Sequence, residues 1–165
     1  MSTRKNKSGF TIVELLISLA ITVMLLTAVA IAFNASAINY KQNESIFKTV
    51  NSARQALYRI TTQLRIAEEV DSTTTDNVCT LLRHQGDTGI TYKYDSSDNT
   101  LYLIDNSTDL PYTLCENVTA MTFSKNTAVI NGLIGVKSVQ ISMTVSDGNI
   151  TQQLSAAAVI RRNLE

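Results

Sequence analysis

The stretch KSGFTIVELLISLAITVMLLTAVAIAF, from Lys7 to Phe33, contains the longest apolar run of the chain. Its apolar run from Phe10 to Phe33 has 24 residues and would be about 36 Å long as a helix. That length crosses the roughly 30 Å hydrocarbon core of a bilayer. No charged residue occurs from Leu15 to Phe33, so the run predicts a membrane-spanning helix. Glu14 is the exception, because a carboxylate in an apolar run is costly and usually has a function.

The charges in front of the run predict its orientation. Arg4, Lys5 and Lys7 precede it, and no acidic residue occurs before Glu14. An excess of basic residues on one side favours a cytoplasmic amino terminus, so the carboxyl-terminal part is expected outside. A secretory signal peptide has a shorter apolar region with its cleavage site after it. Here the run is too long for a signal peptide, and the candidate cleavage site, after Gly9, lies before the run.

The sequence KSGFTIVELLISLAI resembles the leader and cleavage motif of type IV pilins and type II secretion pseudopilins. A short basic leader, residues 1–9, ends in Gly9, and Phe10 follows it. Glu14 lies four residues further on, and a long apolar helix continues from there. The resemblance covers about the first 30 residues. It implies that a prepilin peptidase cuts between Gly9 and Phe10 and then methylates the new amino group of Phe10.

The same resemblance implies a function for Glu14, which in these families meets the free amino terminus of a neighbouring subunit. Pairing with an ammonium lowers the cost of a carboxylate in lipid. The pair also sets the axial register, because a slip of one turn leaves both charges unpaired. The alternative is a hydrated carboxylate near the headgroups, since Glu14 is only one turn from the start of the run.

Residues 34–70 predict an amphipathic continuation of the helix. From Asn39 to Val70 there is no Pro or Gly, and apolar residues recur at alternating spacings of four and three. This stripe consists of Ile46, Val50, Ala53, Leu57, Ile60, Leu64 and Ala67. We expect one long helix whose membrane half is residues 10–33 and whose second half packs on the chain's own sheet. A coiled-coil seam with another subunit is the alternative.

Residues 71–165 predict a β-rich head. The sequence DSTTTDN, 71–77, favours a turn, and the pattern then alternates with a period of two. SSDN, 96–99, reads as a hairpin turn, and a second tight turn is expected at Asp147 and Gly148. In NVTAMTFS the core candidates are Val118, Ala120 and Phe123. A change of phase between residues 136 and 139 indicates a bulge or a late strand start. The expected fold class is α+β, one long helix on a mainly antiparallel sheet.

The head also resembles a subset of the family. Its segments ITYKYDSSDNTLYLID, LCENVTAMTFS and VKSVQISMTV, with the ending VIRRN, are similar in order to the minor pseudopilin J and PilW-like group. This resemblance implies a minor subunit.

Few residues suggest chemistry in the head. Cys79 and Cys115 form a disulfide if the head lies outside the cytoplasm, or else are two buried free thiols, and spacing leaves both open. His84 is the only histidine, and no phosphate-binding loop or serine elbow occurs. Four aspartates, Asp95, Asp98, Asp105 and Asp109, lack ordered calcium-loop spacing and are read as solvated turns in preference to a Ca²⁺ site. No enzyme, metal or cofactor is expected.

Without Arg4, Lys5 and Lys7 the chain would hold 14 − 3 = 11 basic residues against 14 acidic ones. Such a balance argues against nucleic-acid binding. We therefore expect a structural subunit, anchored in the inner (cytoplasmic) membrane by a single span. Its expected partners are prepilin peptidase, other pilin or pseudopilin subunits, the inner-membrane assembly platform and membrane lipid. The alternatives are a competence pilus component and a membrane-anchored sensor or enzyme with an uncleaved span. Whether the machine is a pilus, a secretion pseudopilus or a competence filament stays open.

Overall fold

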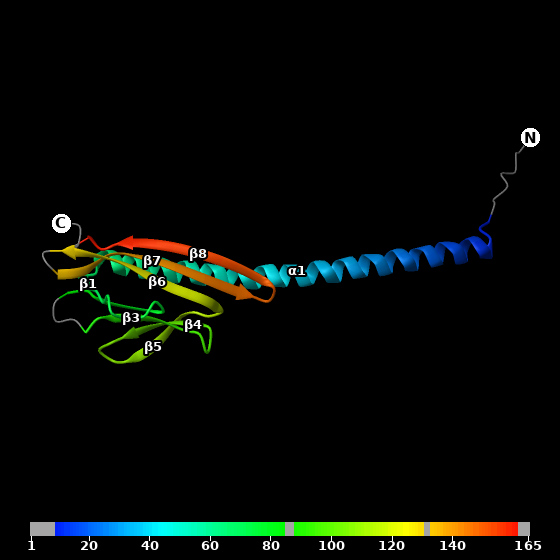
Figure 1. Ribbon diagram of the computed structural model, residues 1–165. Helices are drawn as coiled ribbons and strands as arrows, with labels where there is room; N and C mark the ends of the chain where they lie inside the picture. The colour runs from blue at the N-terminus through cyan, green and yellow to red at the C-terminus, as the bar shows by residue number, and fades with distance from the viewer. Residues whose placement is uncertain (1–8, 85–87, 131–132, 162–165) are drawn as a thin grey trace, which may run out of the picture. The chain divides into compact units, whose positions relative to one another are not determined.

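The computed structural model describes residues 9–84, 88–130 and 133–161, which form one helix and eight strands (Figure 1). The elements are α1 (Ile12–Ile66), β1 (Glu69–Val70), β2 (Val78–Leu82), β3 (Ile90–Asp95), β4 (Thr100–Asp105), β5 (Leu110–Cys115), β6 (Val118–Ile130), β7 (Leu133–Asp147) and β8 (Ile150–Val159). The chain divides into two compact units, Met1–Lys41 and Gln42–Glu165, and the boundary falls within α1.

In the second unit, the expected apolar stripe of α1 faces the core. Six of its seven residues are buried, and Val50 is partly buried against the same core. Three further residues widen the buried face: Thr49, Ala56 and Thr61. The core also contains residues of both sheets, so the prediction that this part of the helix packs on the chain's own strands is confirmed.

The helix ends at Ile66, earlier than the expected residue 70. Glu68 donates its backbone N–H to the carbonyl of Leu82 at 2.8 Å, and Glu69 and Val70 pair with β2. A backbone that bonds across to a strand cannot continue the helical ladder. The stripe residue Ala67 is nevertheless buried, so its side chain still belongs to the core.

The strands form two antiparallel sheets, which confirms the expected α+β class. One has five strands in the order β1-β2-β3-β4-β5, and the other has three in the order β6-β7-β8. Within the second unit, Figure 1 shows β8 and β5 on opposite sides. Among the described strands, each of these two is an edge strand of its sheet, with a hydrogen-bonded neighbour on one side only.

The tight turn expected at Asp147 and Gly148 is present in the last hairpin, with Asp147 as the last residue of β7. The β7–β8 loop is Gly148 and Asn149 between the paired residues Asp147 and Ile150, and Gly148 has φ +58°, a conformation that glycine adopts readily. The carboxylate of Asp147 also accepts hydrogen bonds from the hydroxyl groups of Ser45 and Thr49, which fasten this turn to α1.

The expected change of phase in β7 is a bulge. Asn126 pairs with Ser138, but the next residue, Thr127, pairs with Val136, which leaves Lys137 as the extra residue. Because of this extra residue, Val136 and Val139 are both buried although they lie three positions apart.

The core prediction for β6 was correct for Val118 and Phe123 and wrong for Ala120. Val118 pairs with Val145 and Ala120 with the adjacent Thr144, so the register shifts between them. The shift turns Ala120 to solvent and buries Met121 in its place. A strict alternation from Val118 could not reveal this irregularity.

Candidate functional site: the amino-terminal processing and assembly segment

Gly9 and Phe10 lie exposed before the first residue of α1. The side chain of Phe10 is 86% exposed. A Cβ atom placed on Gly9 would meet no atom within 4 Å, and its φ is outside the left-handed region that favours glycine. The folding of the chain therefore does not require glycine at this position. The rest of the expected leader, residues 1–8, lies outside the described residues.

Glu14 takes part in the start of the helix itself. Thr11 donates to the Glu14 Oε2 atom twice, from its backbone N–H at 3.0 Å and from its hydroxyl at 2.9 Å. The Glu14 backbone N–H in turn donates a hydrogen bond to the Thr11 Oγ1 atom at 3.3 Å. Thr11 thus precedes the first helical residue and Glu14 is the third, which is the arrangement of a capping box.

The capping box satisfies backbone donors that a helix start otherwise leaves unpaired. A carboxylate in the first turn also lies at the positive end of the helix dipole. Both bonds from Thr11 end on Oε2, so Oε1 is not used by the capping box. Sequence reasoning missed this contact, although the spacing Thr-x-x-Glu before an apolar run is its usual signal.

Polar side chains further along the apolar part of α1 are satisfied locally. Hydroxyl groups donate to carbonyls three or four residues earlier: Ser18 to Leu15 at 3.0 Å, Thr22 to Ser18 at 2.7 Å, Thr27 to Met24 at 2.8 Å and Ser36 to Ala32 at 2.9 Å. These bonds leave no hydroxyl donor that needs water, which suits a helix surrounded by lipid.

The apolar side chains of the first unit, in the described part of α1, are exposed. The most hydrophobic window of α1 has a mean hydropathy of 2.7 and none of it is buried. Large side chains such as Met24 and Phe33 are 71% and 75% exposed. By its length and composition this helix fits a membrane anchor.

The two cysteines are apart in the sheet and are free thiols. Cys79 is on β2 and Cys115 on β5, with β3 and β4 between them. Three steps between neighbouring strands amount to roughly 14 Å, whereas a disulfide needs Cα atoms within about 7 Å. The structure therefore has the buried thiols and not the disulfide. Burial raises the pKa of each thiol to about 11.

The four loop aspartates form two pairs at opposite ends of β4. Asp95 ends β3 and Asp98 lies in the β3–β4 loop, whereas Asp105 ends β4 and Asp109 directly precedes β5. Asp95 accepts from the backbone N–H of Ser97 at 3.0 Å, and Asp105 accepts in the same way from Ser107 at 2.9 Å. These side chains thus stabilise their own turns.

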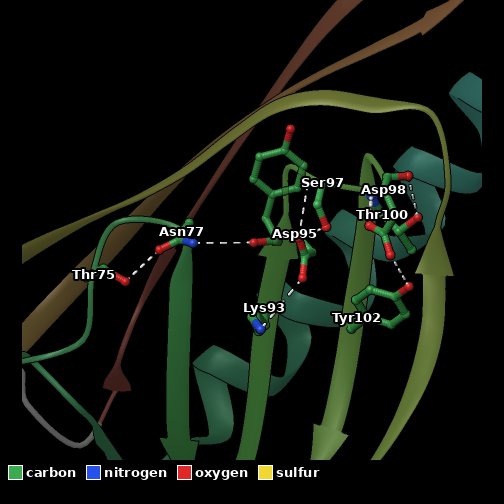
Figure 2. A network of polar contacts seen from close by, with 9 residues as sticks. Thr75, Asn77, Lys93, Asp95, Ser97, Asp98, Thr100 and Tyr102 are labelled. Atoms are coloured by element: carbon green, nitrogen blue, oxygen red, sulfur yellow. Dashed lines mark hydrogen bonds and ion pairs between the residues drawn. The ribbon is translucent and has the colours of Figure 1, made fainter.

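Figure 2 shows how the β3–β4 loop is tied together. Asp98 accepts from the Tyr102 hydroxyl at 2.5 Å and from the Thr100 N–H at 3.1 Å. Lys93 lies 3.7 Å from the Asp95 carboxylate. Hydrogen bonds from Ser97 hold the pKa of Asp95 below its ordinary value, and Lys93 adds to this effect. Among the described residues, no group of three or more His, Cys, Asp or Glu side chains is arranged to hold a metal ion.

Comparison with protein families gives one match, a model described as the prokaryotic N-terminal methylation motif, which covers residues 4–30. Neither the curated proteins nor the solved structures gave a significant match. The matched residues include Gly9, Phe10, the capping box and most of the apolar run. The chain thus carries a prepilin-type amino-terminal motif, which supports a type IV pilin-like or pseudopilin-like protein processed at its amino terminus.

Proposed function

We propose that this chain is a non-catalytic structural subunit of a pilus or pseudopilus. Prepilin peptidase removes the leader between Gly9 and Phe10 and methylates the Phe10 amino group. The assembly platform then draws the subunit from the inner membrane into a filament. The observation that carries this proposal is the match to the methylation motif over residues 4–30, whose glycine lies exposed directly before an uncovered apolar helix.

We further propose that Glu14 pairs with the amino group of Phe10 of a neighbouring subunit. The capping box supports this geometry, because it holds the carboxylate at the helix start through Oε2 and leaves Oε1 for a second donor. Thr11 follows the proposed cleavage site, so its N–H and hydroxyl stay in the mature chain. The ion pair replaces water around the carboxylate with a fixed positive charge.

Glutamine at position 14 separates the two functions of this side chain. Glu14→Gln keeps an acceptor for the capping box, since both residues serve there, but it cannot form an ion pair. We expect Glu14→Gln and Glu14→Ala to reduce the amount of the chain in sheared filaments at least tenfold, and Glu14→Asp to retain part of it. Processing at Gly9 should remain normal in all three variants. Full assembly of Glu14→Gln would show that capping alone explains Glu14.

We assign the head to a minor subunit of the pseudopilin J and PilW-like group, on the similarity of its strand sequences. A minor subunit is present in few copies per filament. Quantitative mass spectrometry of isolated filaments tests this assignment, and an amount equal to that of the most abundant pilin contradicts it.

With the basic leader on the cytoplasmic side, the head lies on the outer side of the membrane.

A further inference from the structure

One flank of α1 in the second unit is both aromatic and basic. Phe47, Arg54, Tyr58 and Arg65 follow one another at spacings of seven, four and seven, so they project from one side of the helix. Phe47 and Tyr58 are 66% and 75% exposed, and both arginines are exposed. We call these four residues the basic-aromatic flank.

A groove runs between this flank and the edge of a sheet. It has a volume of about 400 Å³ and is lined by Arg54 and Tyr58 on α1 and by Gln152–Ala156 on β8. In the described part of the chain β8 pairs with β7 alone, so its other edge is open. The strand Ile150–Val159 contains no charged residue, no Pro and no Gly. It therefore lacks the usual devices that keep a free edge from pairing with another chain.

The last strand of the other sheet offers matching features. Strand β5 pairs with β4 alone among the described strands, and its Leu110 and Tyr112 are 55% and 54% exposed. It has no charged residue of its own, but Asp109 precedes it and Glu116 follows it. The strand is thus an apolar edge with a negative charge at each end.

We propose that the groove between the basic-aromatic flank and β8 binds strand β5 of a second copy of this chain. Leu110 and Tyr112 of that copy pack against Tyr58 and Leu154, and its two acidic residues face the arginines of the flank. Pro111 cannot donate a hydrogen bond, so pairing between the strand edges is confined to the second half of β5. This inference rests on the proposed function, because it describes how assembled heads touch.

Charge complementarity favours a second copy as the occupant. From Gln42 to Ile66, α1 carries four basic residues and one acidic residue. Residues 67–161 carry eleven acidic residues and five basic ones. The helix surface of one head therefore attracts the sheet surface of another, and two like surfaces repel.

The length of β5 also matches the length of the basic-aromatic flank, and the two edge strands lie where the proposed contact needs them. Asp109 and Glu116 are seven residues apart in extended chain, about 23 Å, and Arg54 and Arg65 are about 16 Å apart along the helix. Arginine side chains several ångströms long span the difference. Because β8 and β5 lie on opposite sides of the unit, the contact joins unlike surfaces of two neighbouring copies. Such a heterologous contact leaves one of the two surfaces free on each copy of a pair.

Cysteine crosslinking in assembled filaments tests this contact. Two differently tagged full-length copies are expressed together, one with Gln153→Cys in the groove and one with Thr113→Cys on β5, and sheared filaments are oxidised. We expect a mixed-tag disulfide dimer. The native Cys79 and Cys115 are buried and should not contribute. As a matched control, Gln140→Cys on the central strand β7 should give no dimer with Thr113→Cys.

Two further arms decide the nature of the contact. Gln153→Cys in both copies should give no dimer, because the surfaces are unlike. Arg54→Glu should lower the Gln153–Thr113 dimer severalfold, and Glu116→Arg in the partner copy should restore it. Filaments that contain the chain but give no such dimer, a Gln153–Gln153 dimer, or a link only to a different protein would each overturn this proposal. Loss of filaments or of cleavage at Gly9 would instead contradict the proposed function.

Discussion

At the scale of single residues, the pair Thr11 and Glu14 links the fold to the proposed assembly. The same carboxylate that closes the first turn of α1 through Oε2 is the group proposed to meet a neighbouring amino terminus. Hydrogen bonds within the chain therefore fix the position of the Glu14 carboxylate before a neighbouring subunit binds. The spacing Thr-x-x-Glu before an apolar run is present in the sequence and is typical of a capping box, so this contact was predictable from local pattern alone.

Loss of the capping hydroxyl should loosen the first turn. Thr11→Ala should destabilise the helix start by about 1 kcal/mol, which corresponds to a roughly fivefold change in the opening equilibrium. Amide hydrogen exchange of residues 12–15, measured on the full-length protein in detergent micelles, should rise accordingly. Thr11→Ser keeps the hydroxyl and should behave as the unaltered protein does. Equal exchange in Thr11→Ala would show that the capping box contributes nothing.

At the scale of elements, the pattern of apolar residues was the most reliable guide. It predicted which face of α1 is buried and located the irregularity in β7, although it left open whether this was a bulge or a late strand start, because burial and strand phase leave a periodic pattern. It could not give the end of α1 or the exposure of Ala120. Both depend on hydrogen bonds to other strands, Glu68 to Leu82 in one case and a shifted register against β7 in the other.

Truncation of the buried stripe should destabilise the head. Ile60 is fully buried, so Ile60→Ala should lower the free energy of unfolding by about 2–5 kcal/mol. Tyr58 lies two positions away and is 75% exposed, so Tyr58→Ala should change it by less than about 0.5 kcal/mol. Urea unfolding of the full-length protein in micelles, followed by near-ultraviolet circular dichroism, compares the two. Similar losses would mean that α1 does not pack as described.

At the scale of the whole molecule, strand order decides which distant residues are neighbours. Cys79 and Cys115 looked like candidates for one disulfide, and nothing in their spacing argued against it. The order β2-β3-β4-β5 separates them, and no local pattern in the sequence encodes that order. The match to the methylation motif also ends at residue 30, so the head was predicted from strand patterns and looser similarity alone.

Both thiols should be inert in the folded protein. Burial raises their pKa values to about 11 from the ordinary value of 9.0. Between these two pH values the buried thiols keep their protons in the folded state and lose them in the unfolded state. The free energy of unfolding is therefore unaffected by the thiols below pH 9 and falls as the pH rises from 9 towards 11. At pH 8 a thiol reagent should label neither cysteine in the native protein and both in urea. Rapid labelling of either one without denaturant would contradict the burial.

The mature amino terminus decides whether this chain is a processed pilin-like subunit, as proposed. Mass spectrometry of the protein recovered from native membranes should find a chain that begins at N-methylated Phe10. The variant Gly9→Ala should abolish this species and leave the head folded, because nothing packs against Gly9. A chain that still begins at Met1 or Ser2, in membranes with an active prepilin peptidase, would contradict the proposed function.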